Sequence, residues 1–217
     1  MENQNKINMK NTIFVLLLLI VSCKKEISKD SEIRAENIPA VNRQDSATEK
    51  LSNREILKNL NDEILQTLKT KNYAKFSTFI HPAKGIRFSM YAFIRPDKDK
   101  HFSAPDFMTY IDKPTKFTWG EKDGSGDLLI ISLKDYLETW VFKRDFSRSE
   151  FSLNEFKGGG NSINNLQKIY PQAIFTENYI PGSEKYSGID WNALRFVFEK
   201  YQGKYYLIAM INDQWTI

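Results

Sequence analysis

Two apolar segments near the carboxyl end of the 217-residue chain carry the charged side chains that could do chemistry. In the extended segment "DWNALRFVFEK", alternate residues point to the same face, so Arg195 shares a face with Glu199. In "YYLIAMINDQWTI", the same alternation places Asp213 on the face of Ile211 and Trp215. Burial among apolar side chains raises the pKa of a carboxyl group, which suits it to general base catalysis.

These charged groups have a structural and a functional interpretation. In the structural one, Arg195 and Glu199 form salt bridges on a half-solvated sheet face, across the hairpin or with Arg87 and Glu177 on neighbouring strands. In the functional one, they meet in the mouth of a mostly apolar pocket, where Asp190 or Asp213 acts as the general base. The candidate pocket residues are Trp119, Tyr136, Trp191, Arg195, Glu199, Asn212, Asp213 and Trp215.

Nucleophilic and metal chemistry has little support in the sequence. Of the two histidines, His81 precedes a proline, where its ring is expected to satisfy local backbone groups, and His101 lies in the charged loop "PDKDKHFS". No histidine pair has metal-ligand spacing, and "KDGSGD" lacks the full calcium-loop pattern. The glycine-rich "GGGN" is not followed by the Lys-Ser/Thr of a phosphate-binding loop. We therefore expect no metal and no cofactor.

The single cysteine, Cys23, lies at the end of a signal-peptide pattern. Lys6 and Lys10 precede nine apolar residues, 13–21, which are too few to span a bilayer. The segment "IVSC" resembles the lipobox of bacterial lipoproteins, which implies cleavage before Cys23 and acylation of its thiol. Two or three acyl chains would anchor the protein permanently. The expected division is a signal peptide at 1–22, a lipidated cysteine with a disordered tether at 23–50, and one domain at 51–217.

The predicted location is the cell envelope, anchored in the membrane through the acyl chains. Residues 24–50 contain no aromatic residue and are rich in charged and small polar side chains, so they cannot offset the entropy of ordering. Lys24 is not the aspartate of inner-membrane retention signals, which favours the outer membrane. After cleavage, 29 basic and 26 acidic residues remain, spread along the chain, so we expect no nucleic-acid partner.

The elements that must position these groups can be read from periodicity and capping residues. Ser52 and Glu55 form a capping box before a helical apolar pattern that extends to Leu68, and a short second helix follows at 73–80. Period-two alternation predicts a strand at 86–94. Further elements are expected as a helix at 104–111, strands at 116–120 and 127–131, a helix opened by Ser132, a strand at 173–180, and a closing hairpin of 192–200 and 204–215.

Helices followed by strands and a long apolar hairpin predict an α+β domain, with N-terminal helices packed on a curved, mostly antiparallel sheet. The helix pair "EILQTLKTKNYAKFSTFIHP" and the hairpin "LRFVFEKYQGKYYLIAMINDQW" resemble the NTF2-like superfamily, which implies an open cone. The segments "HPAKGIRFS", "TWGEKDGSGD", "GIDWNALRFVFEK" and "YYLIAMINDQWTI" resemble a family of uncharacterised bacterial lipoproteins, which implies no activity.

The sequence thus leads to three functional hypotheses. The first is a lipid-anchored, non-catalytic envelope domain that binds a small ligand or an envelope protein. The second is a hydrolase or isomerase that uses Asp190 or Asp213 in the cone. The third is a structural accessory subunit that pairs with an envelope complex through a sheet edge.

Overall fold

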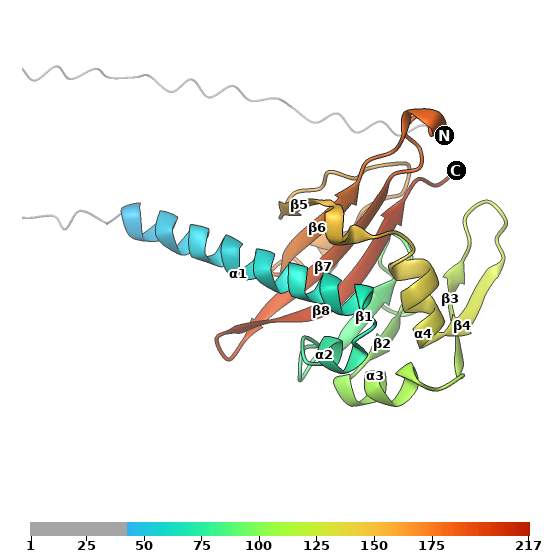
Figure 1. The fold of residues 1–217 in the computed structure, drawn as a ribbon, viewed down its shortest axis with the longest axis horizontal. Coiled ribbons are helices and arrows are strands. Elements are labelled where there is room, and N and C mark those ends of the chain that lie inside the picture. Colours follow the sequence, from blue (N-terminus) through green and yellow to red (C-terminus); the bar gives the residue numbers. More distant parts are fainter. Residues whose placement is uncertain (1–42) are drawn as a thin grey trace, which may run out of the picture. The chain divides into compact units, whose positions relative to one another are not determined.

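The computed structural model describes residues 43–217, with side chains from Ser52 onward. The signal peptide, Cys23 and residues 24–42 of the expected tether lie outside the described residues. Among residues 43–217, no helix has the length and apolar character needed to cross a bilayer. The fold is α+β, as predicted, with a curved and mostly antiparallel sheet (Figure 1).

The main sheet has six strands in the order β2-β1-β8-β7-β6-β5. All its pairings are antiparallel except that of β1 with β8, which is parallel. The closing hairpin is therefore in the middle of the sheet, as its apolar sequence predicted. The strands are β1 (Ile86–Ser89), β2 (Lys100–Phe102), β5 (Glu150–Leu153), β6 (Ile174–Ile180), β7 (Asn192–Tyr201) and β8 (Lys204–Gln214).

A separate two-stranded ribbon is formed by β3 (Lys116–Glu121) and β4 (Leu128–Ser132), close to the predicted strands. The predicted first strand is shorter than expected, because β1 ends at Ser89 and residues 90–94 form a loop. The strands β2 and β5 were not predicted. Each has only three or four residues, which is too short for a clear alternation.

The helix α1 spans Arg43–Lys69 and so begins before the expected capping box. Ser52 lies inside this helix, and the expected boundary between tether and domain at residue 50 falls within it. The segment "RQDSATEK" lacks glycine and proline and contains several good helix formers, so it can extend a helix that packing stabilises further on. The expectation of disorder up to residue 50 was wrong for residues 43–50.

The other helices are short: α2 (Tyr73–Ser77), α3 (Ala104–Ile111), α4 (Leu133–Tyr136), which continues as the π-helical segment η1 (Leu137–Val141), and α5 (Leu166–Ile169). The cap expected at Ser132 is confirmed in α4, where Ser132 accepts the Asp135 N–H. In α3, Ser103 accepts the Asp106 N–H, a cap that was not predicted.

The two faces of the sheet have different covers. Helices α1 to α4 lie over one face (Figure 1), where Leu57, Phe76, Phe107 and Tyr136 pack with sheet residues such as Phe196 in the larger core cluster. The opposite face is covered by the segment 154–173, which includes the glycine-rich loop and α5. Its smaller core cluster consists of Ile94, Leu166, Phe175, Val197, Ile208, Ala209 and Ile211.

A β-bulge changes the facing of β8. Val197 pairs with Ala209 and Phe198 pairs with Leu207, so Ile208 is an extra residue without a partner. Strict alternation along this strand was therefore wrong: Leu207 belongs to the helix-covered core, whereas Ala209 belongs to the other one. Because of the bulge, simple alternation counted from the hairpin turn gives the wrong face of the sheet for residues after Ile208.

Candidate functional site

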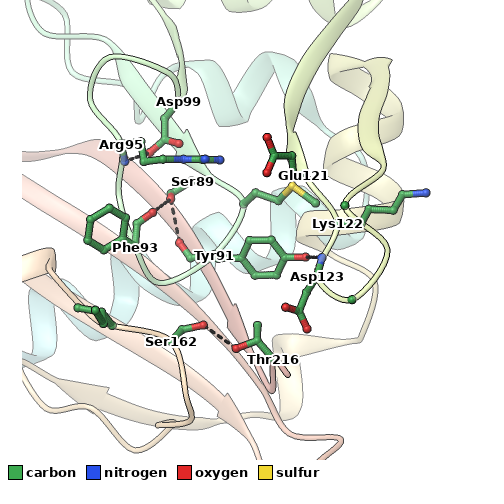
Figure 2. A pocket seen from close by; sticks show the side chains of 14 residues that line it. Ser89, Tyr91, Phe93, Arg95, Asp99, Glu121, Lys122, Asp123, Ser162 and Thr216 are labelled. Atoms are coloured by element: carbon green, nitrogen blue, oxygen red, sulfur yellow. Dashed lines mark hydrogen bonds between the residues drawn. The ribbon is translucent and has the colours of Figure 1, made fainter.

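A pocket among the described residues begins where β1 ends. Ser89 donates its hydroxyl hydrogen to the Tyr91 carbonyl oxygen at 2.8 Å and lies 3.4 Å from the Phe93 carbonyl oxygen. These contacts curl the chain into a loop instead of allowing the strand to continue. The loop buries Ile94 and leaves Phe93 at the surface. The curled loop forms one wall of the pocket (Figure 2).

Asp99 fixes the far end of this loop. Its Oδ2 accepts the Arg95 N–H at 2.8 Å, and the Asp99 N–H returns to the Arg95 carbonyl oxygen at 2.8 Å. Arg87 supports the same turn from outside by donating to the Pro96 carbonyl oxygen. The Asp99 side chain is buried, and this burial raises its pKa, although the Arg95 N–H and nearby cations oppose the rise. The pocket thus has an acidic group in a desolvated position.

The opposite wall is the turn between β3 and β4. The Asp123 N–H donates to the Tyr91 hydroxyl at 2.8 Å, which ties this turn to the curled loop. The Asp123 carboxylate in turn accepts the Ile217 N–H at 2.8 Å. Thr216 bonds to the Ser162 hydroxyl at 2.9 Å, so the last residues of the chain join the turn to the glycine-rich loop.

The pocket enclosed by these three segments has a volume of about 550 Å³, within the usual range for small-molecule sites. Its side chains are mixed in character (Figure 2). Phe93 and Ile163 are large apolar residues that are 47% and 72% exposed beside it. Arg95, Asp99 and Glu121 add charges of both signs. Apolar surface beside a few fixed polar groups suits the binding of a small amphiphilic molecule.

No family model, curated protein or solved structure matches this chain. The function must therefore be inferred from the geometry of the pocket and its charged groups.

The sheet face under the glycine-rich loop contains a buried ionic cluster. Arg195 Nε donates to Glu177 at 2.5 Å, and its Nη2 donates to Asp213 at 2.7 Å. All three side chains are at least 96% buried. Pairing of Arg195 with Glu177 was one of the expected alternatives and is confirmed. The cluster is fully buried, however, because the glycine-rich loop covers the face that was expected to be half solvated.

This ionic cluster holds the glycine-rich loop by its backbone. Glu177 Oε1 accepts the N–H groups of Lys157 and Gly158, and Arg195 Nη2 donates to the Gly158 carbonyl oxygen at 3.0 Å. The Phe156 ring lies 4.8 Å from the Arg195 guanidinium carbon. A loop of glycines offers no side chains to bury, so its backbone groups supply the contacts.

Asp213 does not line any of the pockets described for residues 43–217, although it is buried. Burial raises its pKa, with a further contribution from Glu177, while Arg195 acts in the opposite direction. The raised pKa was expected of a general base. The carboxylate points at Arg195 rather than at a cavity, so it has no access to a substrate.

Asp190 lies in the loop before β7, at the surface. Its carboxylate accepts the Ser183 N–H at 2.6 Å and the Ser183 hydroxyl at 3.0 Å. The backbone hydrogen bond from Ser183 lowers the pKa of Asp190, which is the reverse of what the base hypothesis required. Asp190 is also solvated, so burial cannot activate it.

The aromatic candidates do not line one cone-shaped pocket. Trp119 and Tyr136 stack on each other with ring centroids 3.6 Å apart, buried in the helix-covered core. Trp191 packs against the glycine-rich loop on the opposite face, and Trp215 is 38% exposed. Side chains fill the space that was expected to be open. Asp190, Trp191 and Trp215 do line one pocket together, of about 380 Å³, on the surface beside Lys143 and Arg144.

The remaining candidates serve local structure. Asn212 donates to the Val141 carbonyl oxygen at 3.3 Å, at the end of η1. Glu199 pairs with Lys84 at 2.7 Å, and its other oxygen lies 4.0 Å from the His81 ring. His81 Nδ1 accepts the N–H groups of the two residues after Pro82, as expected of a histidine that satisfies local backbone.

The residues of the 550 Å³ pocket were missed by sequence reasoning because they come from three distant loops. Residues 89–99, 121–126 and 162–163 meet Thr216 only in the folded domain. One local signal was available. Phe93 lies near the end of the alternating segment 86–94, two residues before the polar segment "RPDKDK". A large apolar residue this close to a polar segment is typical of a loop with an exposed apolar residue.

Within residues 43–217, no group of three or more His, Cys, Asp or Glu side chains lies close enough together to hold a metal ion.

Proposed function

We propose that the protein is a lipid-anchored cell-envelope protein whose folded domain binds a small amphiphilic ligand without transforming it. The observation that carries this proposal is the 550 Å³ pocket, in which exposed apolar residues stand beside fixed charges. Phe93 and Ile163 are exposed on two separate loops. A ligand that covers their apolar surface therefore gains favourable binding free energy. Anchorage through Cys23, in the outer membrane, is the part of the proposal that rests on the lipobox resemblance.

Binding is favoured over catalysis by the position of the two candidate bases. Asp213 is occupied by Arg195 in the ionic cluster, and Asp190 is solvated with a lowered pKa. A general base must lie within hydrogen-bond reach of the proton that it removes. Asp99 is the buried carboxylate nearest to a pocket, but its Oδ2 is engaged by the Arg95 backbone N–H. Kinship with the NTF2-like proteins remains a prediction.

The neutral dye Nile red tests the pocket without involving its charges. We expect saturable binding with one site per chain, detected by fluorescence of the acyl-free domain. Phe93→Ser should weaken this binding about tenfold, because one large apolar contact is lost. Ile130→Ser is the matched control, since Ile130 lies outside the pocket and has the same 47% exposure as Phe93. Equal losses in the two variants, or no saturable binding, would contradict the proposal.

The anchor is tested separately in the native host. Replacing Cys23 with Ser should move the protein from the membrane fraction to the soluble one and abolish its labelling by radioactive palmitate. Continued labelling of the Cys23→Ser variant would refute the assignment. Outer-membrane location predicts that the wild-type protein sediments with outer-membrane vesicles after density-gradient separation, rather than with inner-membrane markers.

A further inference from the structure

The pocket has a cation and an anion that do not neutralise each other. Arg95 and Glu121 both line it, and none of the salt bridges among the described residues includes either one. Figure 2 shows Arg95 and Glu121 in the same part of the pocket as Asp99, while Lys122 extends away from them. The two charges are therefore available to a ligand.

The backbone of β3 determines where the guanidinium lies. A Cβ atom on Gly120 would stand 3.1 Å from Arg95 Nη2 and 3.1 Å from Met90 Sδ. The absence of a side chain at this position leaves room for the Arg95 guanidinium beside the strand. Glu121 is the next residue along β3, so the cation and the anion are presented from neighbouring positions of the wall.

The other carboxylates of the pocket have roles inside the protein. Asp99 accepts the Arg95 N–H, and Asp123 accepts the Ile217 N–H. Their negative charge still adds to the field in this part of the pocket. An anionic ligand without a positive group would be repelled by these carboxylates, and a ligand without a negative group would leave Arg95 without a counter-charge. A ligand with one charge of each sign meets both requirements.

The apolar requirement comes from the other side of the pocket. Phe93 and Ile163 stand there, and Ser162 and Thr216, whose hydroxyls bond to each other, also line the pocket. A ligand that covers this surface needs an apolar group near its charged end. A pocket of about 550 Å³ has room for an amino acid or a short peptide with such a side chain.

We propose that the pocket binds an apolar amino acid or short peptide as a zwitterion. Arg95 pairs with the ligand carboxylate, Glu121 pairs with its ammonium group, and Phe93 and Ile163 cover its apolar side chain. This inference rests on the proposed function, since it names the ligand class of the same site. It goes further by requiring both charges on one ligand.

The test uses isothermal titration calorimetry of the acyl-free domain at pH 7 with L-leucyl-L-phenylalanine as the probe. N-acetylation removes the ammonium group of the probe, and C-terminal amidation removes its carboxylate. We expect each modified dipeptide to bind about tenfold more weakly than the free one, because each loses a charge-assisted contact.

Two variants assign the charges to residues. In Arg95→Gln the free dipeptide and its amide should bind equally, whereas in Glu121→Gln the free and the N-acetylated dipeptides should bind equally. This crosswise pattern is a coupling that general unfolding does not produce. Lys98→Gln and Asp97→Asn are the matched controls, because both residues are exposed and lie outside this pocket. They should leave all three affinities unchanged.

The outcomes separate the two proposals. If Nile red binds and the dipeptide neither binds nor displaces it, the zwitterion class is overturned and the proposed pocket stands. Binding of all three dipeptides with equal affinity would also overturn the class. If neither probe binds a folded domain, both proposals fail together.

Discussion

The two faces of the sheet are sealed in different ways. The helix-covered face is closed by large apolar side chains, with Trp119 stacked on Tyr136 and packed edge-on against Phe88. The loop-covered face has a smaller apolar cluster, and charged groups supplement it, because Arg195 and Glu177 bond to the backbone of the glycine-rich loop. Shape and hydrophobic burial hold the first cover, whereas the second also depends on hydrogen bonds between buried ions and main-chain groups.

The glycines of the covering loop need another source of stability. Gly158 and Gly160 let the loop approach Trp191 closely, since a Cβ on either would stand 3.0 Å or less from its ring. The same absence of side chains removes the hydrophobic contribution at these positions. Buried ions supply directional bonds instead, at the cost of keeping three charged groups out of water. The loop-covered face should therefore respond to pH, and the helix-covered face should not.

The largest losses of stability should come from replacing one central residue under each cover, Arg195 or Trp119. Arg195→Met leaves Glu177 and Asp213 buried without their cation, and Trp119→Ala leaves a cavity. We expect each to lower the free energy of unfolding by about 3–5 kcal/mol at pH 7. In urea denaturation at pH 4.5, the deficit of Arg195→Met should shrink, because burial raises the pKa of Asp213 and its carboxyl group can take up a proton. Equal pH dependence in the two variants would remove the distinction between the faces.

A smaller effect is expected from adding one methyl group to the loop. Gly158→Ala places its Cβ 2.9 Å from Trp191 and 3.1 Å from the Ala193 Cβ, so the loop must shift and strain the bonds to the ionic cluster. We expect a loss of about 1–3 kcal/mol. Gly159→Ala is the control, since no atom lies within 4 Å of its added Cβ. Thermal melts of both variants measure the difference, and a harmless Gly158→Ala would mean that the loop is loosely held.

The smallest effect should be the titration of Asp213. Its pKa is raised above the ordinary 3.8, so folding favours the protonated form. That contribution is complete below 3.8 and is lost as the pH rises through the raised pKa. Asp213→Asn mimics the protonated state at every pH. Its stability relative to the wild type should therefore increase between pH 4 and pH 7, and a decrease would show that Arg195 favours the charged form instead.

Local features of this fold could be predicted from the sequence, since their causes lie within a few residues. The cap at Ser132 depends on a hydroxyl and a backbone N–H three positions away. The apolar arms of the hairpin likewise identify a strand pair in the middle of a sheet. Fold class follows from the order of such elements, which explains why the α+β prediction is confirmed.

The candidate site could not be predicted in the same way. The bulge at Ile208 depends on how β7 and β8 pack, and no residue type in the sequence predicts it. The pairing of Arg195 with Glu177 could be predicted by assuming that their strands are neighbours. Asp213, the second partner of Arg195, was instead expected to act as a general base. The start of α1 was misplaced because a good capping sequence at Ser52 lies within a longer helix.

The central position of β8 affects the order in which the chain can acquire its structure. Arg87 on β1 pairs with Ala209 on β8, and Phe196 on β7 pairs with Met210. Until residues 204–214 are available, no strand can pair with both β1 and β7, so the main sheet cannot be completed. Contacts this distant in sequence are slow to form, since a long loop must close first. We therefore expect completion of the main sheet to be a late step in folding.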